Sequence, residues 1–161
     1  RHPRPHPRRH LPPVGARTSS MSAILAPVLA AILSILALIH LYWMVRGVGA
    51  SAAVPSHPDG TPVFRPGRGA SFLVAAALLL AATIVLGQAQ VLRLDLPPGL
   101  LRLGTWGLAA AFAARAVGDF RFVGLFKRVR GTRFACWDSL LFTPLCLAIA
   151  LSAAIVATSA E

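Results

Sequence analysis

The chain has 161 residues, of which 56% are hydrophobic and only 13% are charged, whereas soluble domains carry roughly 25% charged residues. This composition argues against an ordinary soluble domain. The formal net charge of +11 indicates an acidic partner, but the basic residues lie between apolar blocks and no nucleic-acid-binding motif is present. Nucleic acid is therefore excluded as a partner, and anionic membrane lipid is the expected counter-charge.

The first twenty residues, RHPRPHPRRHLPPVGARTSS, are rich in arginine and proline and have no hydrophobic periodicity. Such a segment cannot pack a core, so residues 1–20 are predicted to be a disordered basic tail. Because Met21 directly precedes the first apolar block, we expect the native protein to start there and the domain to comprise residues 21–161. A zinc site at His2, His6 and His10 is disfavoured, since the intervening prolines favour extended chain.

Four apolar blocks follow, each close to the roughly 20 residues that a helix needs to cross a bilayer. They are Ala23–Val45, Ala70–Gln88, Leu100–Val117 and Ser139–Thr158. The blocks do not alternate as barrel strands do, and a soluble bundle would show polar faces that residues 75–85 lack. The first block is longer than the apolar region of a signal peptide, and Pro97 and Pro98 mark the start of the third helix. The sequence thus predicts an all-α integral membrane bundle of four transmembrane helices.

Basic residues between the blocks predict the orientation. Four spans place both termini on one side, and from Met21 on that side holds Arg93 and Arg102. The other side holds eight basic residues, which are Arg46, Arg65, Arg68, Arg121, Lys127, Arg128, Arg130 and Arg133. The positive-inside rule then puts loops 46–69 and 119–138 in the cytoplasm and the multi-pass chain in the inner or plasma membrane. The arginines of the tail would raise the first count to seven, so this orientation depends on the start site.

The loop between the third and fourth spans combines apolar and basic side chains. On a helix from Phe120, the apolar residues Phe122, Leu125, Phe126 and Val129 would occupy one arc and the cations the remainder. This pattern is typical of a short basic interfacial helix, which Gly124 weakens and Gly131 ends. The cations could serve only to fix topology, or they could bind an anionic headgroup or phosphate.

Polar residues gather where the odd-numbered spans end. Arg115 and Asp119 are one helical turn apart and can pair, which would make them a structural clamp on the third span. Span parity brings His40 to the same face, together with Asp138, Ser139 and Thr143 at the start of the fourth span. An ionisable residue in a membrane span is a functional candidate, although a lone histidine is as often a structural hydrogen-bond donor. The candidate polar site is His40, Arg115, Asp119, Arg121, Lys127, Arg128 and Arg130.

Three segments carry a resemblance to a known family. They are HLYW at 40–43, RAVGDFRFVGLFKRVRGTRFACWD at 115–138 and LFTPLCL at 141–147. With these segments the chain resembles the small bacterial membrane family called domain of unknown function 3995. The resemblance implies four spans and no established activity, substrate or cofactor. The chain departs from the family pattern in MVRGVG after HLYW, and the tail has no place in that pattern.

Three functional classes remain open. Phosphate loops, metal-binding motifs and nucleophile elbows are absent from the sequence, so no cofactor, metal site or catalytic residue is predicted. The favoured hypothesis is a membrane protein that binds an anionic lipid or phosphate headgroup at its cytoplasmic face. The alternatives are a small transporter or channel, which would have to form a homo-oligomer to enclose a path, and a membrane enzyme that acts on a lipid through His40 and Asp119.

Overall fold

The computed structural model describes residues 14–48 and 53–159, with the backbone alone for 14–20. Its elements are α1 (Val14–Arg46), α2 (Arg68–Gln88), α3 (Pro98–Val117), α4 (Arg133–Trp137), the π-helical turn η1 (Asp138–Phe142) and α5 (Thr143–Thr158). In this part of the chain four helical segments are long and apolar enough to cross a membrane, and no strand forms. They are Met21–Arg46, Arg68–Gln88, Pro98–Val117 and Arg133–Thr158, which confirms the predicted four-span all-α fold.

The helix ends follow from local sequence. Pro97 is the residue before α3 and Pro98 its first residue, as predicted, because a proline in the first helical turn lacks only an amide that has no intrahelical acceptor. The predicted tail falls mostly outside the described residues. Of residues 1–20, the structure describes only the helical backbone of 14–20, which continues into the first span.

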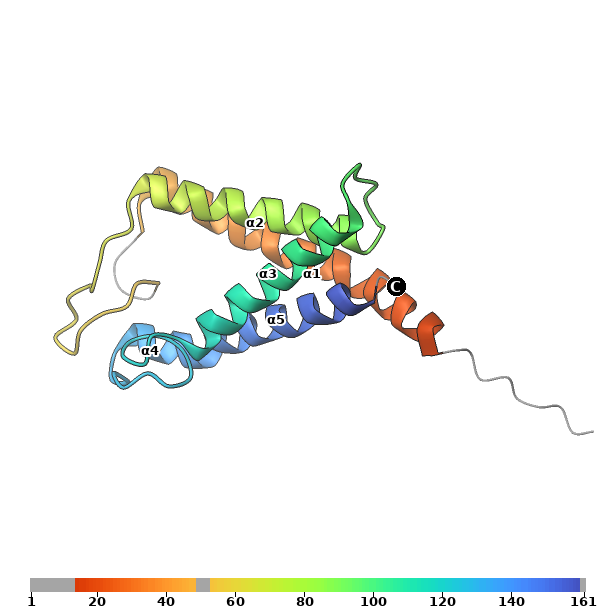
Figure 1. Cartoon of the computed structure of the whole chain (residues 1–161). Coiled ribbons are helices and arrows are strands. Elements are labelled where there is room, and N and C mark those ends of the chain that lie inside the picture. The colour runs from red at the N-terminus through yellow and green to blue at the C-terminus, as the bar shows by residue number, and fades with distance from the viewer. Residues whose placement is uncertain (1–13, 49–52, 160–161) are drawn as a thin grey trace, which may run out of the picture.

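The spans pack as two pairs, α1 with α2 and α3 with α5, and the contacts between the pairs are fewer. Figure 1 shows the pairs diverging toward the end that carries the first loop (residues 47–67) and the third loop (118–132). The core is built largely from small residues, such as Ala26, Ala37 and Ala75, which let the helices approach closely. Large apolar side chains point outward instead: Ile24, Leu73 and Leu140 are 70%, 68% and 72% exposed, as expected for lipid-facing positions.

The fourth span begins six residues earlier than the predicted Ser139 and is not one uniform helix. It starts with α4, widens into the π-helical turn η1, and continues as α5. Pro144 explains the wide turn, because its ring has no amide to donate and clashes with the carbonyl four residues earlier. The amide of Thr143 donates to the carbonyl of Asp138 instead, five residues back. The turn therefore places Asp138 at the mouth of the span.

The predicted interfacial helix from Phe120 is wrong, because the third loop is irregular until α4 begins at Arg133. Gly118, Phe120 and Gly124 have φ values of 86°, 60° and 88°, which lie in the left-handed region and are incompatible with a right-handed helix. The loop instead folds back onto α3, where the amide of Leu125 donates to the carbonyl of Ala116 in the last helical turn at 2.9 Å.

Candidate polar site at the mouth of the third and fourth spans

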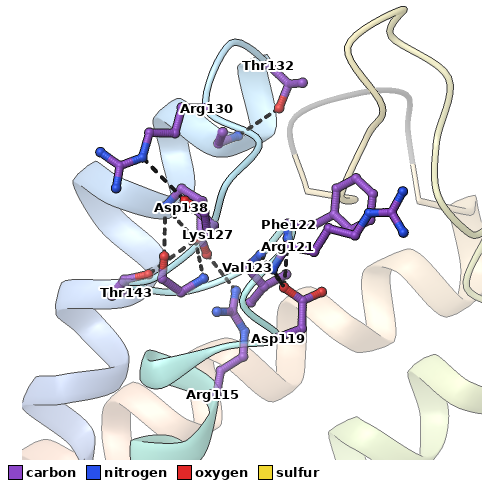
Figure 2. Close-up of polar contacts among 12 residues, drawn as sticks. Arg115, Asp119, Arg121, Phe122, Val123, Lys127, Arg130, Thr132, Asp138 and Thr143 are labelled. Carbon is purple, nitrogen blue, oxygen red and sulfur yellow. Dashed lines mark hydrogen bonds and ion pairs between the residues drawn. The ribbon is translucent and has the colours of Figure 1, made fainter.

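A buried carboxylate organises this end of the molecule. Asp138 is 0% exposed and accepts four hydrogen bonds from three segments (Figure 2). Its Oδ1 accepts from Nη2 of Arg115 at 2.8 Å. Its Oδ2 accepts from the Gly124 amide at 2.8 Å, from Nζ of Lys127 at 3.0 Å and from the Thr143 hydroxyl at 3.2 Å. We call these five residues the Asp138 cluster.

The cluster satisfies a charge that would otherwise be expensive to bury. An unpaired carboxylate in an apolar interior costs several kcal/mol, and removal of one partner of a buried ion pair typically costs about 3–5 kcal/mol. Lys127 is only 4% exposed and also donates to the carbonyl of Gly124 at 3.1 Å, so both partners are fixed. Because Arg115 and Lys127 face one carboxylate, the cluster carries a net positive charge. Within the described residues, Nη1 of Arg115 is buried without a hydrogen-bond partner.

Asp119 does not pair with Arg115, so that prediction is wrong. Its Oδ1 instead accepts the backbone amides of Arg121 at 2.9 Å, Phe122 at 2.7 Å and Val123 at 2.9 Å. Partial burial raises the pKa of the Asp119 carboxyl, but these amide donors lower it further, so the pKa lies below its usual range. Figure 2 shows the Arg115 side chain directed at Asp138, while Asp119 caps the loop beside it.

His40 lies apart from this cluster. Its Nδ1 donates to the carbonyl of Leu36 at 2.8 Å, and its ring stands edge-on to Trp43 with centroids 5.0 Å apart. Among the described contacts, no hydrogen bond or ion pair joins it to Asp119 or Arg115. α1 packs chiefly on α2. The ends of α1 and α3 therefore lie at the same side of the bundle, as parity predicts, but His40 and Arg115 do not meet there. The His40–Asp119 acid–base pair of the enzyme hypothesis is not assembled in this structure.

The remaining predicted cations differ in their surroundings. Arg121 and Arg128 are exposed, and the guanidinium of Arg121 lies 5.0 Å from the ring centroid of Phe122. Arg130 is exposed too, and its Nε donates to the carbonyl of Lys127 at 3.3 Å. The third loop therefore presents arginines outward around a lysine that is buried.

Two hollows flank the cluster. The span-four groove, of about 190 Å³, runs from the third loop along the start of the fourth span. Its lining includes Lys127, Arg130, Ser139, Thr143, Pro144 and Leu147. The junction cavity, of about 390 Å³, lies where the first loop crosses the end of α3. Its lining includes Pro55, Phe64, Arg115, Asp119, Val123 and Phe134.

Sequence reasoning placed Asp138 on this face but missed that it is the centre of the cluster. The available signal was the position of an acid directly before an apolar run, where a carboxylate requires a cationic partner. Arg115 and Lys127 were the candidates, but their separations of 23 and 11 residues from Asp138 follow no local rule. In the described residues, no group of three His, Cys, Asp or Glu side chains could hold a metal ion.

This fold and this site define a multi-pass helical membrane protein with an ion-pair cluster at the mouth of two spans. A family model described as a protein of unknown function, DUF3995, matches residues 33–153. The chain therefore belongs to this family, as its sequence segments predicted. No curated protein matches the chain, and no solved structure does.

Proposed function

We propose that the protein binds an anionic membrane lipid in the span-four groove. The observation that carries this proposal is the change in chemistry along the groove. Its loop end has Arg130 and Ser139, and its far end has Pro144 and Leu147 on the flank of the fourth span. A phospholipid has the same order of groups, with a charged headgroup above an acyl chain.

The loop end is suited to a phosphate. Arg130 uses Nε for the Lys127 carbonyl, and within the described residues its two terminal nitrogens make no hydrogen bond or ion pair. A guanidinium can bind two phosphate oxygens at once, which a lysine ammonium cannot do in the same planar geometry. Among the described residues no acid lines this groove, and the adjacent Asp138 is fully buried and already bound to two cations. An incoming anion therefore meets positive charge without a competing exposed carboxylate.

Exposed aromatic residues support a position of the third loop at the bilayer interface. Phe120 and Phe126 are 57% and 59% exposed, and their rings stack with centroids 6.0 Å apart. Neighbouring Leu125 is 49% exposed. Apolar side chains interleaved with arginines are typical of segments that lie among headgroups. The sequence predicted that these residues enter the interface as a helix, and in this proposal they enter it as a loop.

The proposed orientation puts the first and third loops in the cytoplasm of the inner or plasma membrane, from the count of eight basic residues against two. Labelling of single cysteines at three exposed positions tests it, in a background with Cys136 and Cys146 replaced. In intact cells, an impermeant thiol reagent should label Asp95→Cys and should leave Arg65→Cys and Arg128→Cys unlabelled. The opposite pattern would refute the orientation.

Native mass spectrometry tests the lipid site. The protein in mild detergent is incubated with phosphatidylglycerol, and lipid retention is compared among Arg130→Ala, Arg130→Lys and the matched variants Arg128→Ala and Arg128→Lys. We expect both Arg130 variants to lose most of the bound lipid and both Arg128 variants to keep it, because Arg128 does not line the groove. Equal small losses in all four would indicate non-specific surface attraction and would overturn the proposal.

A further inference from the structure

The junction cavity is a second hollow with different chemistry. The first loop contributes residues to its wall, and part of this loop is buried. Val54 is 6% exposed and Ser56 is 7% exposed, although both lie in a loop. The ring of His57 stands edge-on to Phe122 of the third loop, with centroids 5.3 Å apart. Two loops in contact with each other therefore contribute to the cavity wall, together with the end of α3 and the start of α4.

Apolar side chains form most of the cavity wall, with Pro55 and Phe64 from the first loop, Val123 from the third loop and Phe134 from α4. The charged residues in the wall are Arg115 and Asp119. No ion pair joins these two in the described part of the chain, because Arg115 bonds to Asp138. The cavity thus keeps a cation and an anion that do not neutralise each other directly.

Asp119 retains an unused hydrogen-bond acceptor, and Arg115 contributes positive charge to the wall. All three hydrogen bonds to Asp119 go to Oδ1, and Figure 2 shows the other carboxylate oxygen pointing away from the three amides. The Arg115 side chain is 35% exposed, and it belongs to a cluster with two cations and one carboxylate. The wall on the Arg115 side is therefore positive, and the wall at Asp119 is negative.

A simple anion in this cavity would meet Asp119, and a simple cation would meet the net positive cluster behind Arg115. We infer that the junction cavity binds a zwitterion, with a primary ammonium on Asp119 and an anionic group on the Arg115 side. A volume of about 390 Å³ lies within the range of small-molecule sites. The ethanolamine phosphate headgroup of a lipid has this chemistry, and so does a free amino acid.

Competition between lipids tests this inference. Native mass spectra are recorded with equimolar phosphatidylethanolamine and phosphatidylglycerol. The ratio of retained phosphatidylethanolamine to retained phosphatidylglycerol is compared between wild type and Asp119→Asn. This substitution keeps an Oδ1 acceptor for the three amides, removes the charge and replaces the free oxygen with an amide donor that repels an ammonium. We expect the ratio to fall about tenfold, the effect of losing one charge-assisted hydrogen bond. The matched control, Asp59→Asn, removes an exposed carboxylate from the first loop outside the cavity and should leave the ratio unchanged.

A headgroup series repeats the test without any substitution, so loss of folding cannot imitate the result. Phosphatidylcholine carries a trimethylammonium that cannot donate a hydrogen bond to Asp119, and wild type should retain it several-fold less than phosphatidylethanolamine. Displacement of bound phosphatidylethanolamine by millimolar glycine would identify a soluble zwitterion as the occupant, and retention would identify the lipid. Equal retention of all headgroups, or an unchanged ratio in Asp119→Asn, would overturn the inference. Loss of phosphatidylglycerol in Arg130 variants tests the span-four groove separately.

Discussion

The first and third loops lie at the same end of the bundle, but different interactions hold them. The acid within the first loop, Asp59, serves its own turn: its Oδ1 accepts from the amide and the hydroxyl of Thr61 at 2.9 and 2.7 Å. The third loop has a local cap in Asp119 and, in addition, Asp138 from the following span, which binds Gly124 and Lys127. A surface turn of the first kind can rearrange alone. A loop of the second kind can rearrange only if a buried ion pair breaks. An aspartate at Asp138 therefore contributes much more to the free energy of unfolding than one at Asp59.

The largest expected effect separates the two acids at the extremes of this comparison. Asp138→Asn leaves Arg115 and Lys127 without a buried counter-charge and should reduce the free energy of unfolding by about 3–5 kcal/mol. Asp59→Asn, at a fully exposed turn, should leave the free energy of unfolding nearly unchanged. Reversible unfolding of both variants in mixed detergent measures the difference. Equal losses would show that the cluster contributes no more than a surface turn.

Glycine substitutions compare the two loops next. Gly118 and Gly60 both have φ near 85°, at 86° and 85°, so alanine is strained at either site by about 1–2 kcal/mol. A Cβ on Gly118 would also overlap the carbonyl oxygen of Val123, whereas a Cβ on Gly60 would meet nothing within 4 Å. Gly118→Ala should therefore lower the thermal midpoint in detergent at least twice as much as Gly60→Ala. Similar shifts would mean that the third loop yields as easily as the first.

The cap of the third loop should have a smaller effect. Asp119→Ala removes the acceptor of three amides and should cost about 1 kcal/mol, because the carboxylate is largely exposed. Asp119→Asn keeps an acceptor and should cost less than half of that amount. The same unfolding measurement checks both, with Asp95→Ala, in the loop between α2 and α3, as the control. If the asparagine and alanine variants were equally unstable, charge rather than the acceptor would hold the loop.

The smallest expected effect is on pH dependence. The amide donors keep the pKa of Asp119 below its usual range despite partial burial, and the hydroxyl and amide of Thr61 lower the pKa of Asp59. A lowered pKa means that each cap stabilises its loop fully above the ordinary value, near pH 4, and loses that contribution as the pH falls through the lowered value. The amide chemical shifts of Val123 and Thr61 should therefore stay constant from pH 7 to about 4. A transition above pH 5 would contradict both assignments.

The sequence predicted the four spans because the length of an apolar run is a local property. It predicted that His40 and Arg115 lie at the same end of the bundle but not that they lie apart. The alternating direction of the spans fixes the side on which a helix ends, whereas it does not fix which helices pack together. The third loop was mispredicted because an apolar arc on a helical projection ignores the backbone. Gly118 and Gly124 were visible signals of left-handed conformation, whereas the left-handed Phe120 was not. The Asp138 cluster depends on contacts 11 and 23 residues apart, which only tertiary packing reveals.

The position of Asp138 also has a consequence for biogenesis. The chain is synthesised from its N-terminus, so Arg115 and Lys127 leave the ribosome before the carboxylate that binds both of them. Until the fourth span follows, these two cations lack that partner and the third loop lacks the contact that fixes Gly124. The first helix pair can assemble as soon as α2 is inserted. The cluster can close only after the fourth span reaches the membrane, which makes it a late step in the assembly of these four spans.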